Sequence, residues 1–127
     1  MRKLLVGLAL SLGATAASAQ WVLVTEASSG DKFYADPTTK RRTGNLVRIW
    51  MLQDYPKPEV VLGQAYYSDK MYRQYDCVER TSQSLQNTSF EGRMGSGQSL
   101  GTSTQPTSVS FVAPDSIGDT LLNFACK

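Results

Sequence analysis

Cys77 and Cys126 are the two cysteines of this 127-residue sequence, and the sequence contains no histidine. The lack of histidine excludes histidine-based catalytic triads, Cys–His nucleophile pairs and nearly all zinc sites. The two cysteines do not form a C-x-x-C pair, so nothing indicates a redox enzyme. We therefore predict that they form one structural disulfide; a catalytic or metal-binding thiol is the alternative.

General acid–base chemistry would fall to carboxylates, and two of them could converge to the separation that glycosidases use. Turns favour aspartate for local hydrogen bonding, and several of the candidates border predicted turns. We therefore predict a protein that is not an enzyme, with no catalytic, cofactor-binding or metal-binding residues. The candidates considered are Asp36, Asp54, Asp69 and Asp76. The glycines Gly92, Gly95 and Gly97 have neither dinucleotide-binding nor P-loop spacing and predict a turn.

Lys40, Arg41 and Arg42 form the only run of three like charges, in the polar segment 38–44, which we predict to be a loop. This loop is a candidate contact for a sulfated glycan, a phosphate-bearing surface or an acidic partner protein. The alternative is that the three side chains are simply solvated. The aromatic residues offer a binding face or ordinary sheet packing. They include Trp21, Tyr34, Trp50, Tyr66, Tyr67, Tyr72 and Tyr75.

The N-terminus has the pattern of a cleavable export signal. Basic Arg2 and Lys3 precede the apolar run 4–12, and Ala17-Ser18-Ala19 provides the small residues of a signal-peptidase site. The apolar run is shorter than the ~20 residues of a membrane-spanning helix, which argues against a retained anchor. We predict cleavage after Ala19, with residues 1–19 as signal and 20–127 as one exported domain.

Export would change the net charge of the chain and expose its cysteines to an oxidising compartment. The sequence has 13 basic and 11 acidic residues, and loss of Arg2 and Lys3 leaves equal numbers. A neutral mature chain gives no electrostatic argument for nucleic acid or an anionic membrane. The compartment beyond the inner membrane is oxidising, which favours the Cys77–Cys126 disulfide. Gln20 rather than cysteine follows the cleavage site, so the signal is not of the lipoprotein type.

Short runs rich in Val, Thr, Tyr, Trp and Phe, separated by turn residues, predict strands. The run 46–52 is apolar on both faces and predicts a central strand. Pro56 and Pro58 predict a loop over 54–58, because proline cannot donate to a strand ladder. The remaining predicted strands are 21–25, 32–35, 68–80, 81–90, 98–104 and 109–112. For the strand 68–80, a start near 65–67 is the alternative.

We predict that the C-terminal segment packs against the strand 68–80. Period two places Met71, Tyr75 and Cys77 on the inward face. Arg73 falls in the same phase, so it either reaches past the rim with its stem buried or pairs with a carboxylate. After Pro114, either Asp115 or Ser116 can cap a helix. Apolar residues at four-residue spacing follow and predict a helix that ends near Cys126. The predicted fold class is α+β: about six antiparallel strands, with one C-terminal helix tethered to a face by the disulfide.

A series of short motifs in order resembles the bacterial surface-adhesin protein E family, over nearly the whole mature chain. The motifs are Phe33-Tyr34-Ala35-Asp36-Pro37, Val47-Arg48-Ile49-Trp50, Tyr66-Tyr67-Ser68-Asp69-Lys70, Tyr75-Asp76-Cys77, Met94-Gly95-Ser96-Gly97, Val112-Ala113-Pro114-Asp115-Ser116 and Ala125-Cys126. The resemblance implies a six-stranded antiparallel sheet with a disulfide-tethered C-terminal helix. It also implies an outer-surface adhesin that binds host proteins such as vitronectin and laminin, and a homodimer.

Our leading hypothesis is an exported, non-enzymatic, adhesin-like domain that binds host extracellular-matrix or serum proteins. The second is a periplasmic structural or assembly protein that binds a cell-envelope partner. A small hydrolase is the third. Within the strand 68–80, the face opposite the core carries Tyr72, Gln74 and Asp76, and we expect function on that face or in the loops.

Overall fold

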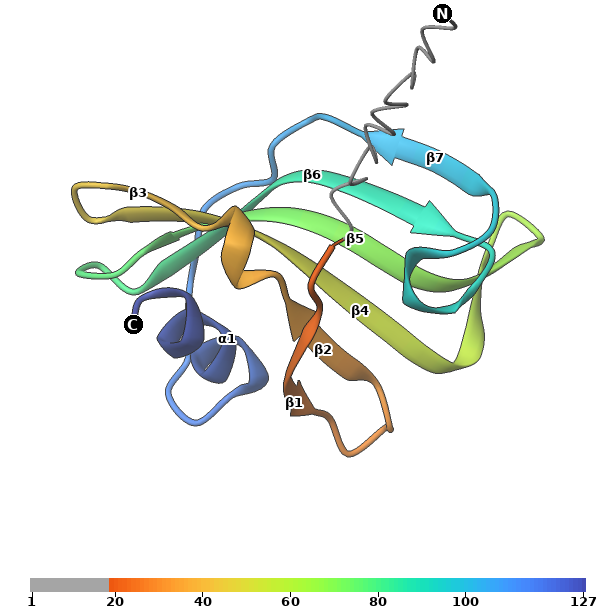
Figure 1. The fold of residues 1–127 in the computed structure, drawn as a ribbon, viewed down its shortest axis with the longest axis horizontal. Coiled ribbons are helices and arrows are strands. Elements are labelled where there is room, and N and C mark those ends of the chain that lie inside the picture. The colour runs from red at the N-terminus through yellow and green to blue at the C-terminus, as the bar shows by residue number, and fades with distance from the viewer. Residues whose placement is uncertain (1–18) are drawn as a thin grey trace, which may run out of the picture.

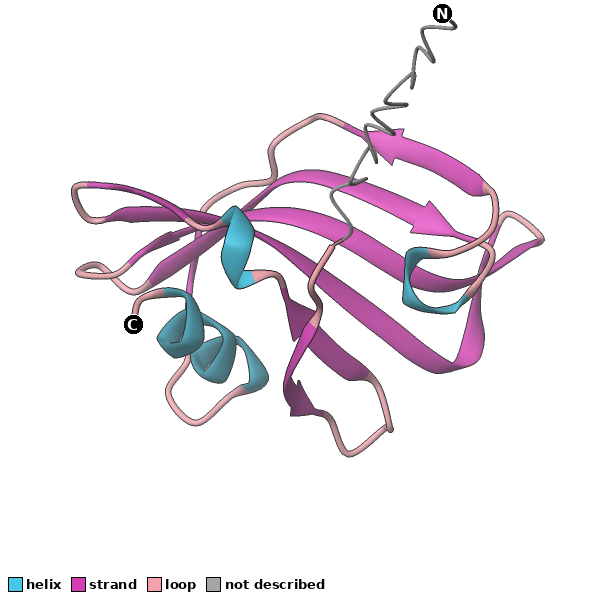
Figure 2. Cartoon of the chain, viewed as in Figure 1, coloured by secondary structure: helices cyan, strands magenta, loops and turns pink. Residues whose placement is uncertain are grey.

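The computed structural model describes residues 19–127, and the predicted export signal lies outside them apart from Ala19. The elements in order are β1 Val22–Glu26, β2 Lys32–Ala35, the 3-10 turn η1 Pro37–Thr39, β3 Arg41–Thr43, β4 Leu46–Val61, β5 Gln64–Asp76, β6 Thr81–Phe90, the 3-10 turn η2 Arg93–Gly95, β7 Ser99–Ser103, β8 Ser110–Phe111 and α1 Ile117–Ala125. Figure 2 shows that strands dominate this part of the chain. Within it, no helix has the length and apolar character needed to cross a membrane.

The strands form one antiparallel sheet in the order β1-β2-β4-β5-β6-β7. Two short strands lie outside this path, since β3 pairs with β4 and β8 pairs with β6. Figure 1 shows α1 beneath the end of the sheet that carries the β3–β4 and β5–β6 turns, while the β4–β5 hairpin projects from the other end. The predicted α+β class, with one C-terminal helix on a face, is confirmed.

The apolar run 46–52 lies in β4, which is central as predicted, with β2 and β3 on one side and β5 on the other. The loop predicted over 54–58 is wrong, because β4 continues through both prolines to Val61. The prolines disrupt the hydrogen-bonded pairing of β4 with β5, but they do not end the strand. Residues 55–58 of β4 stand opposite only Tyr67 of β5, in an irregularity that leaves the prolines outside the regular ladder.

The core lies between α1 and one face of the sheet. On β4 the alternate residues Val47, Ile49 and Met51 face α1 and are at most 1% exposed. Leu122 of α1 is fully buried, and a leucine buried in this way contributes about 1.5–3 kcal/mol. The buried cluster consists of Ala35, Val47, Ile49, Met51, Tyr75, Leu121, Leu122 and Ala125. Met71 and Cys77 pack against it, so the inward face predicted for this strand is confirmed.

The strand predicted over 68–80 begins earlier and ends earlier in the structure, as β5 over Gln64–Asp76. The carboxylate of Asp76 accepts hydrogen bonds from the backbone N–H groups of Val78 and Glu79, at 3.0 and 2.9 Å. An aspartate that bonds amides two and three residues ahead closes a turn, which ends the strand. Cys77 therefore lies in the turn between β5 and β6, one residue beyond β5.

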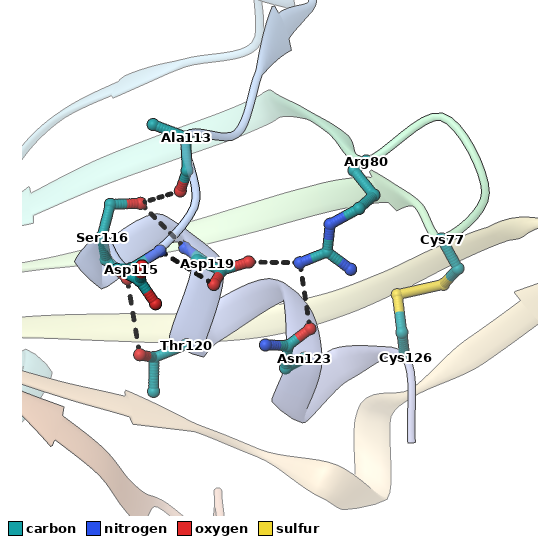
Figure 3. Close-up of polar contacts among 9 residues, drawn as sticks. All are labelled: Cys77, Arg80, Ala113, Asp115, Ser116, Asp119, Thr120, Asn123 and Cys126. Carbon is teal, nitrogen blue, oxygen red and sulfur yellow. Dashed lines mark hydrogen bonds and ion pairs between the residues drawn. A yellow bond between two sulfur atoms is a disulfide. The ribbon is translucent and has the colours of Figure 1, made fainter.

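Covalent and polar contacts fix α1 to this turn (Figure 3). Cys77 and Cys126 form the predicted disulfide, with Cα atoms 5.8 Å apart. Arg80 forms an ion pair with Asp119 and also donates a hydrogen bond to the side-chain oxygen of Asn123. The hydroxyl of Ser116 accepts from the N–H of Asp119, so Ser116, one of the two candidates at 115 and 116, is the N-terminal cap. A nine-residue helix is marginal alone, so these contacts determine its position.

Candidate functional site

The four candidate carboxylates do not form a pair. Asp54 pairs with Ser68 across β4 and β5, whereas Asp69 follows Ser68 and therefore faces the other side of the sheet. Asp69 accepts hydrogen bonds from the hydroxyls of Tyr55 and Ser89, both at 2.5 Å. Asp54 accepts from the N–H of Met94, so it holds η2 against the sheet. The structure thus gives each of these two carboxylates its own structural partners.

The other two carboxylates close turns. Asp76 caps the turn after β5, as described above. Asp36 follows β2 and caps η1, where it accepts from the N–H of Thr38 at 3.0 Å. Among residues 19–127, no group of three or more potential metal ligands lies together.

Burial raises the pKa of three tyrosines on or beside β5. The pKa of Tyr55 rises through desolvation first and then through its hydrogen bond to Asp69. Desolvation also raises the pKa of Tyr66, with smaller contributions from Asp69 and Glu59. The pKa of Tyr75 is raised by burial, against an opposing effect of Arg73. These phenols are therefore neutral over the whole physiological pH range.

The predicted basic loop is partly a strand, because Arg41 and Arg42 lie in β3. Lys40 precedes β3, and its ammonium donates to the backbone carbonyl of Lys127 at the end of the chain. Successive strand residues point to opposite faces, so Arg41 and Arg42 diverge. Arg41 stands opposite Arg48 of β4, which places both guanidinium groups on the face away from α1. The run of three charges therefore contributes one residue, Arg41, to that face.

An aromatic pair lies on the same face. Trp50 of β4 and Tyr72 of β5 are direct cross-strand neighbours, and their rings stack with centroids 4.9 Å apart. Beside them, Arg48 donates to the side-chain oxygen of Gln74 at 2.8 Å. Stacked aromatic pairs of this kind add about 0.5–1.5 kcal/mol beyond area burial and hold both rings rigidly. We call Arg41, Arg48, Trp50, Tyr72 and Gln74 the aromatic–basic face.

Two hollows of about 410 Å³ each flank the stacked pair. One lies on the arginine side and is lined by Arg41, Thr43, Leu46, Arg48, Tyr72 and Gln74. The other lies on the side of η1 and is lined by Ala19, Trp21, Asp36, Thr38, Thr39, Trp50 and Lys70. Tyr72 and Gln74 are two of the residues expected on the face opposite the core. The third, Asp76, accepts hydrogen bonds from the backbone of the turn after β5.

The sequence did not indicate that Trp50 and Tyr72 would stack, or that Arg41 and Arg48 would lie side by side. Both relationships depend on the strand register, which pairs residues far apart in the chain. The sequence did offer one signal for this face, the alternation of side chains within each strand. It predicts that Arg48 shares a face with Trp50, and that Tyr72 shares a face with Gln74. The missing information was the offset between β3, β4 and β5.

Comparison with known proteins identifies the fold and the family. Two solved structures of protein E from Haemophilus influenzae are similar, with TM-scores of 0.69 and 0.67 at 12% sequence identity. The matches cover 86% of this chain in both cases, and 88% and 85% of those chains. A third, from non-typeable H. influenzae, has a TM-score of 0.60 at 13% identity and covers 88% of this chain and 78% of that one. No curated protein sequence matches this chain significantly. The family model for surface-adhesin protein E matches residues 21–127. This confirms the resemblance seen in the motifs: the chain belongs to the surface-adhesin protein E family.

Proposed function

We propose that this protein is an exported, non-enzymatic adhesin-like domain that binds a host extracellular-matrix or serum protein through the aromatic–basic face. The observation that carries the proposal is the stacked Trp50–Tyr72 pair, flanked by two hollows and by Arg41 and Arg48. Tryptophan, tyrosine and arginine are the residue types that dominate binding energy at protein interfaces. Here they occur together on a rigid pair of central strands.

The charges of this face favour an acidic partner. Arg41 and Arg48 face one another across β3 and β4, and the two ion pairs within residues 19–127 involve Arg80 and Arg93 instead. Two neighbouring guanidinium groups can each bind a carboxylate in a bidentate manner. The aromatic rings provide apolar contact area beside them. Lys40 and Arg42 do not lie on this face; their positive charge contributes only to the longer-range potential, which would increase the association rate with an acidic partner.

The direct experiment measures binding of the mature chain to immobilised matrix and serum proteins, with vitronectin and laminin among them. The proposal expects saturable binding to at least one of them, weakened by salt because the contact includes arginines. Absence of binding to the whole panel would contradict the host-protein proposal.

A second candidate function is a periplasmic structural or assembly role with a cell-envelope partner. The observation that favours it is that both cysteines of the sequence lie in the disulfide, so neither thiol is available to carry a lipid. Protease treatment of intact cells separates the two functions. Degradation on intact cells supports the adhesin, whereas protection until the outer membrane is opened supports the periplasmic role.

We also propose that the protein forms a homodimer through a sheet edge. β7 is a terminal strand in the sheet order, and its outer side has no strand partner within residues 19–127. All of its residues except Leu100 are exposed. Unpaired strand edges readily pair with a second chain.

A further inference from the structure

Asp36 is a buried carboxylate that has only neutral hydrogen-bond donors in the described part of the chain. It is 3% exposed. One oxygen, Oδ1, accepts from the N–H and the hydroxyl of Thr38, at 3.0 and 2.5 Å. The other, Oδ2, accepts from the backbone N–H of Gln20 at 3.1 Å. Neither ion pair found within residues 19–127 involves Asp36. Burial of an unpaired carboxylate is costly, so a positive charge at Oδ2 would stabilise this site.

Gln20 is also the residue that becomes the N-terminus if the export signal is cleaved after Ala19. Cleavage would turn the backbone nitrogen of Gln20 from an amide into a primary amine. Such an α-amine has a pKa of about 7.7–8.0 and is largely protonated at neutral pH. The atom that gains the charge is therefore the atom that already lies 3.1 Å from the carboxylate.

We propose that Asp36 is an internal binding site for the α-ammonium group of the mature chain. Signal cleavage would then supply the counter-ion of Asp36 and create an ion pair that the precursor lacks. The proposal depends on the predicted cleavage after Ala19 and is independent of the binding function proposed above.

This ion pair would fasten the open end of the β1–β2 hairpin. Val22 pairs with Ala35 at the last position of that ladder, and Gln20 and Asp36 lie just beyond it. β1 is an outer strand of the sheet, with β2 as its strand partner, and it also contacts α1. Fastening its start therefore secures one side of the core. Ala19 lines the hollow beside Trp50, so its removal would also widen that part of the candidate binding surface.

The same contact would protect the N-terminus chemically. An N-terminal glutamine cyclises when its neutral amine attacks its own side-chain amide carbon: a new C–N bond forms, the bond to the amide nitrogen breaks, and ammonia leaves. The attack needs the lone pair of the amine, which a protonated amine lacks. By holding Gln20 as an ammonium, Asp36 would slow this cyclisation in the folded protein.

The first measurement is the mass and stability of the exported protein. We expect a chain that begins at Gln20 and retains its amine, without the loss of one ammonia that marks cyclisation. A chain that begins at Ala19 keeps Asp36 intact but carries its α-ammonium group on Ala19, so the nitrogen of Gln20 beside Asp36 remains a neutral amide. Its folding equilibrium constant should be about tenfold lower than that of the Gln20 chain. Equal stability of the two chains, or a mature start at another residue, would overturn the proposal.

The second measurement is the rate of cyclisation in the folded protein, followed by mass. Asp36→Asn keeps an oxygen that can accept from Thr38 but removes the charge, and it should cyclise several-fold faster than the wild-type chain. Asp76→Asn is the matched control, because Asp76 also closes a turn by accepting backbone N–H groups. An Asp36→Asn rate equal to the wild-type and control rates would contradict the proposal. If Asp36→Asn does not fold, the comparison of the Gln20 and Ala19 chains decides.

Discussion

Cys77 and Cys126 join the turn after β5 to the residue that follows α1; they are 49 positions apart in the chain, and their Cα atoms are 5.8 Å apart. This disulfide holds α1 against the face of the central strands that forms the core. The opposite face of the same strands carries Trp50 and Tyr72. One pair of strands therefore supports the core on one side and the candidate binding surface on the other.

Cys77→Ser and Cys126→Ser should each destabilise the protein, by equal amounts. The loop-closure estimate for a bridge of this length is about 4 kcal/mol. The double variant should lose no more than either single variant, because all three lack the same bond. Denaturant unfolding of the three proteins measures this, and additive losses would contradict it.

The unfolding free energy should fall as the pH rises above about 10. Burial raises the pKa of Tyr55 and Tyr75 in the folded protein, while the unfolded phenols ionise near pH 10. Above that pH the unfolded state binds fewer protons than the folded state, so stability decreases with pH. Below pH 10 both states are protonated and the contribution is complete. Denaturant titrations between pH 8 and about 11 test this dependence.

Tyr55→Phe should weaken the alkaline loss of stability, because one of the phenols with raised pKa is removed. It should also cost about 1–3 kcal/mol at neutral pH, since Asp69 loses a donor in a buried position. An alkaline slope equal to that of the wild-type protein would show that Tyr55 does not contribute.

Gly95→Ala should destabilise the protein more than Gly44→Ala. Both glycines have a left-handed backbone, with φ of +68° and +59°, so alanine is strained at either position. At Gly95 the added carbon would also overlap Cε of Lys70, so the end of that side chain would have to move from its place over the ring of Phe90, and the carbon would lie 3.3 Å from the side chain of Leu52. Nothing lies within 4 Å at Gly44. The expected difference in unfolding free energy is about 1 kcal/mol, and equal losses would contradict the close packing of η2.

Light scattering across micromolar concentrations should give the mass of a dimer. The expected contact is between exposed sheet edges such as β7, where a second copy can continue the ladder. A monomer mass over the whole range would contradict the proposed homodimer.

The sequence predicted the helix and the strand faces that depend on residues close together in the chain. The cap at Ser116 and the apolar spacing in α1 predicted the helix, and alternation predicted the inward side chains of β5. The prolines at 56 and 58 misled the prediction, because a bulge removes them from the ladder while β4 continues. The prediction that the strand continued through 77–80 was wrong, because the carboxylate of Asp76 binds the N–H groups of Val78 and Glu79. This is a local turn that the period-two alternation did not reveal.

The candidate site depended on information that one sequence does not carry. Arg73 could have reached solvent or a carboxylate; instead its guanidinium lies over the ring of Tyr75 and donates to Ser82. Arg41 appeared as part of a loop with two other charges, but pairing with β4 separates it from Arg42. The register between strands decides each of these contacts.

The most direct test of the proposed function compares binding of a host matrix or serum protein by three variants. Tyr72→Ala and Arg48→Ala change the aromatic–basic face, and Phe111→Ala is the control, since Phe111 is 85% exposed on β8. Loss of a central aromatic or arginine at an interface typically costs about 2 kcal/mol or more. We predict that Tyr72→Ala and Arg48→Ala each weaken binding more than tenfold while Phe111→Ala leaves it unchanged. Undiminished binding by both face variants, with the fold intact, would contradict the assignment of this face.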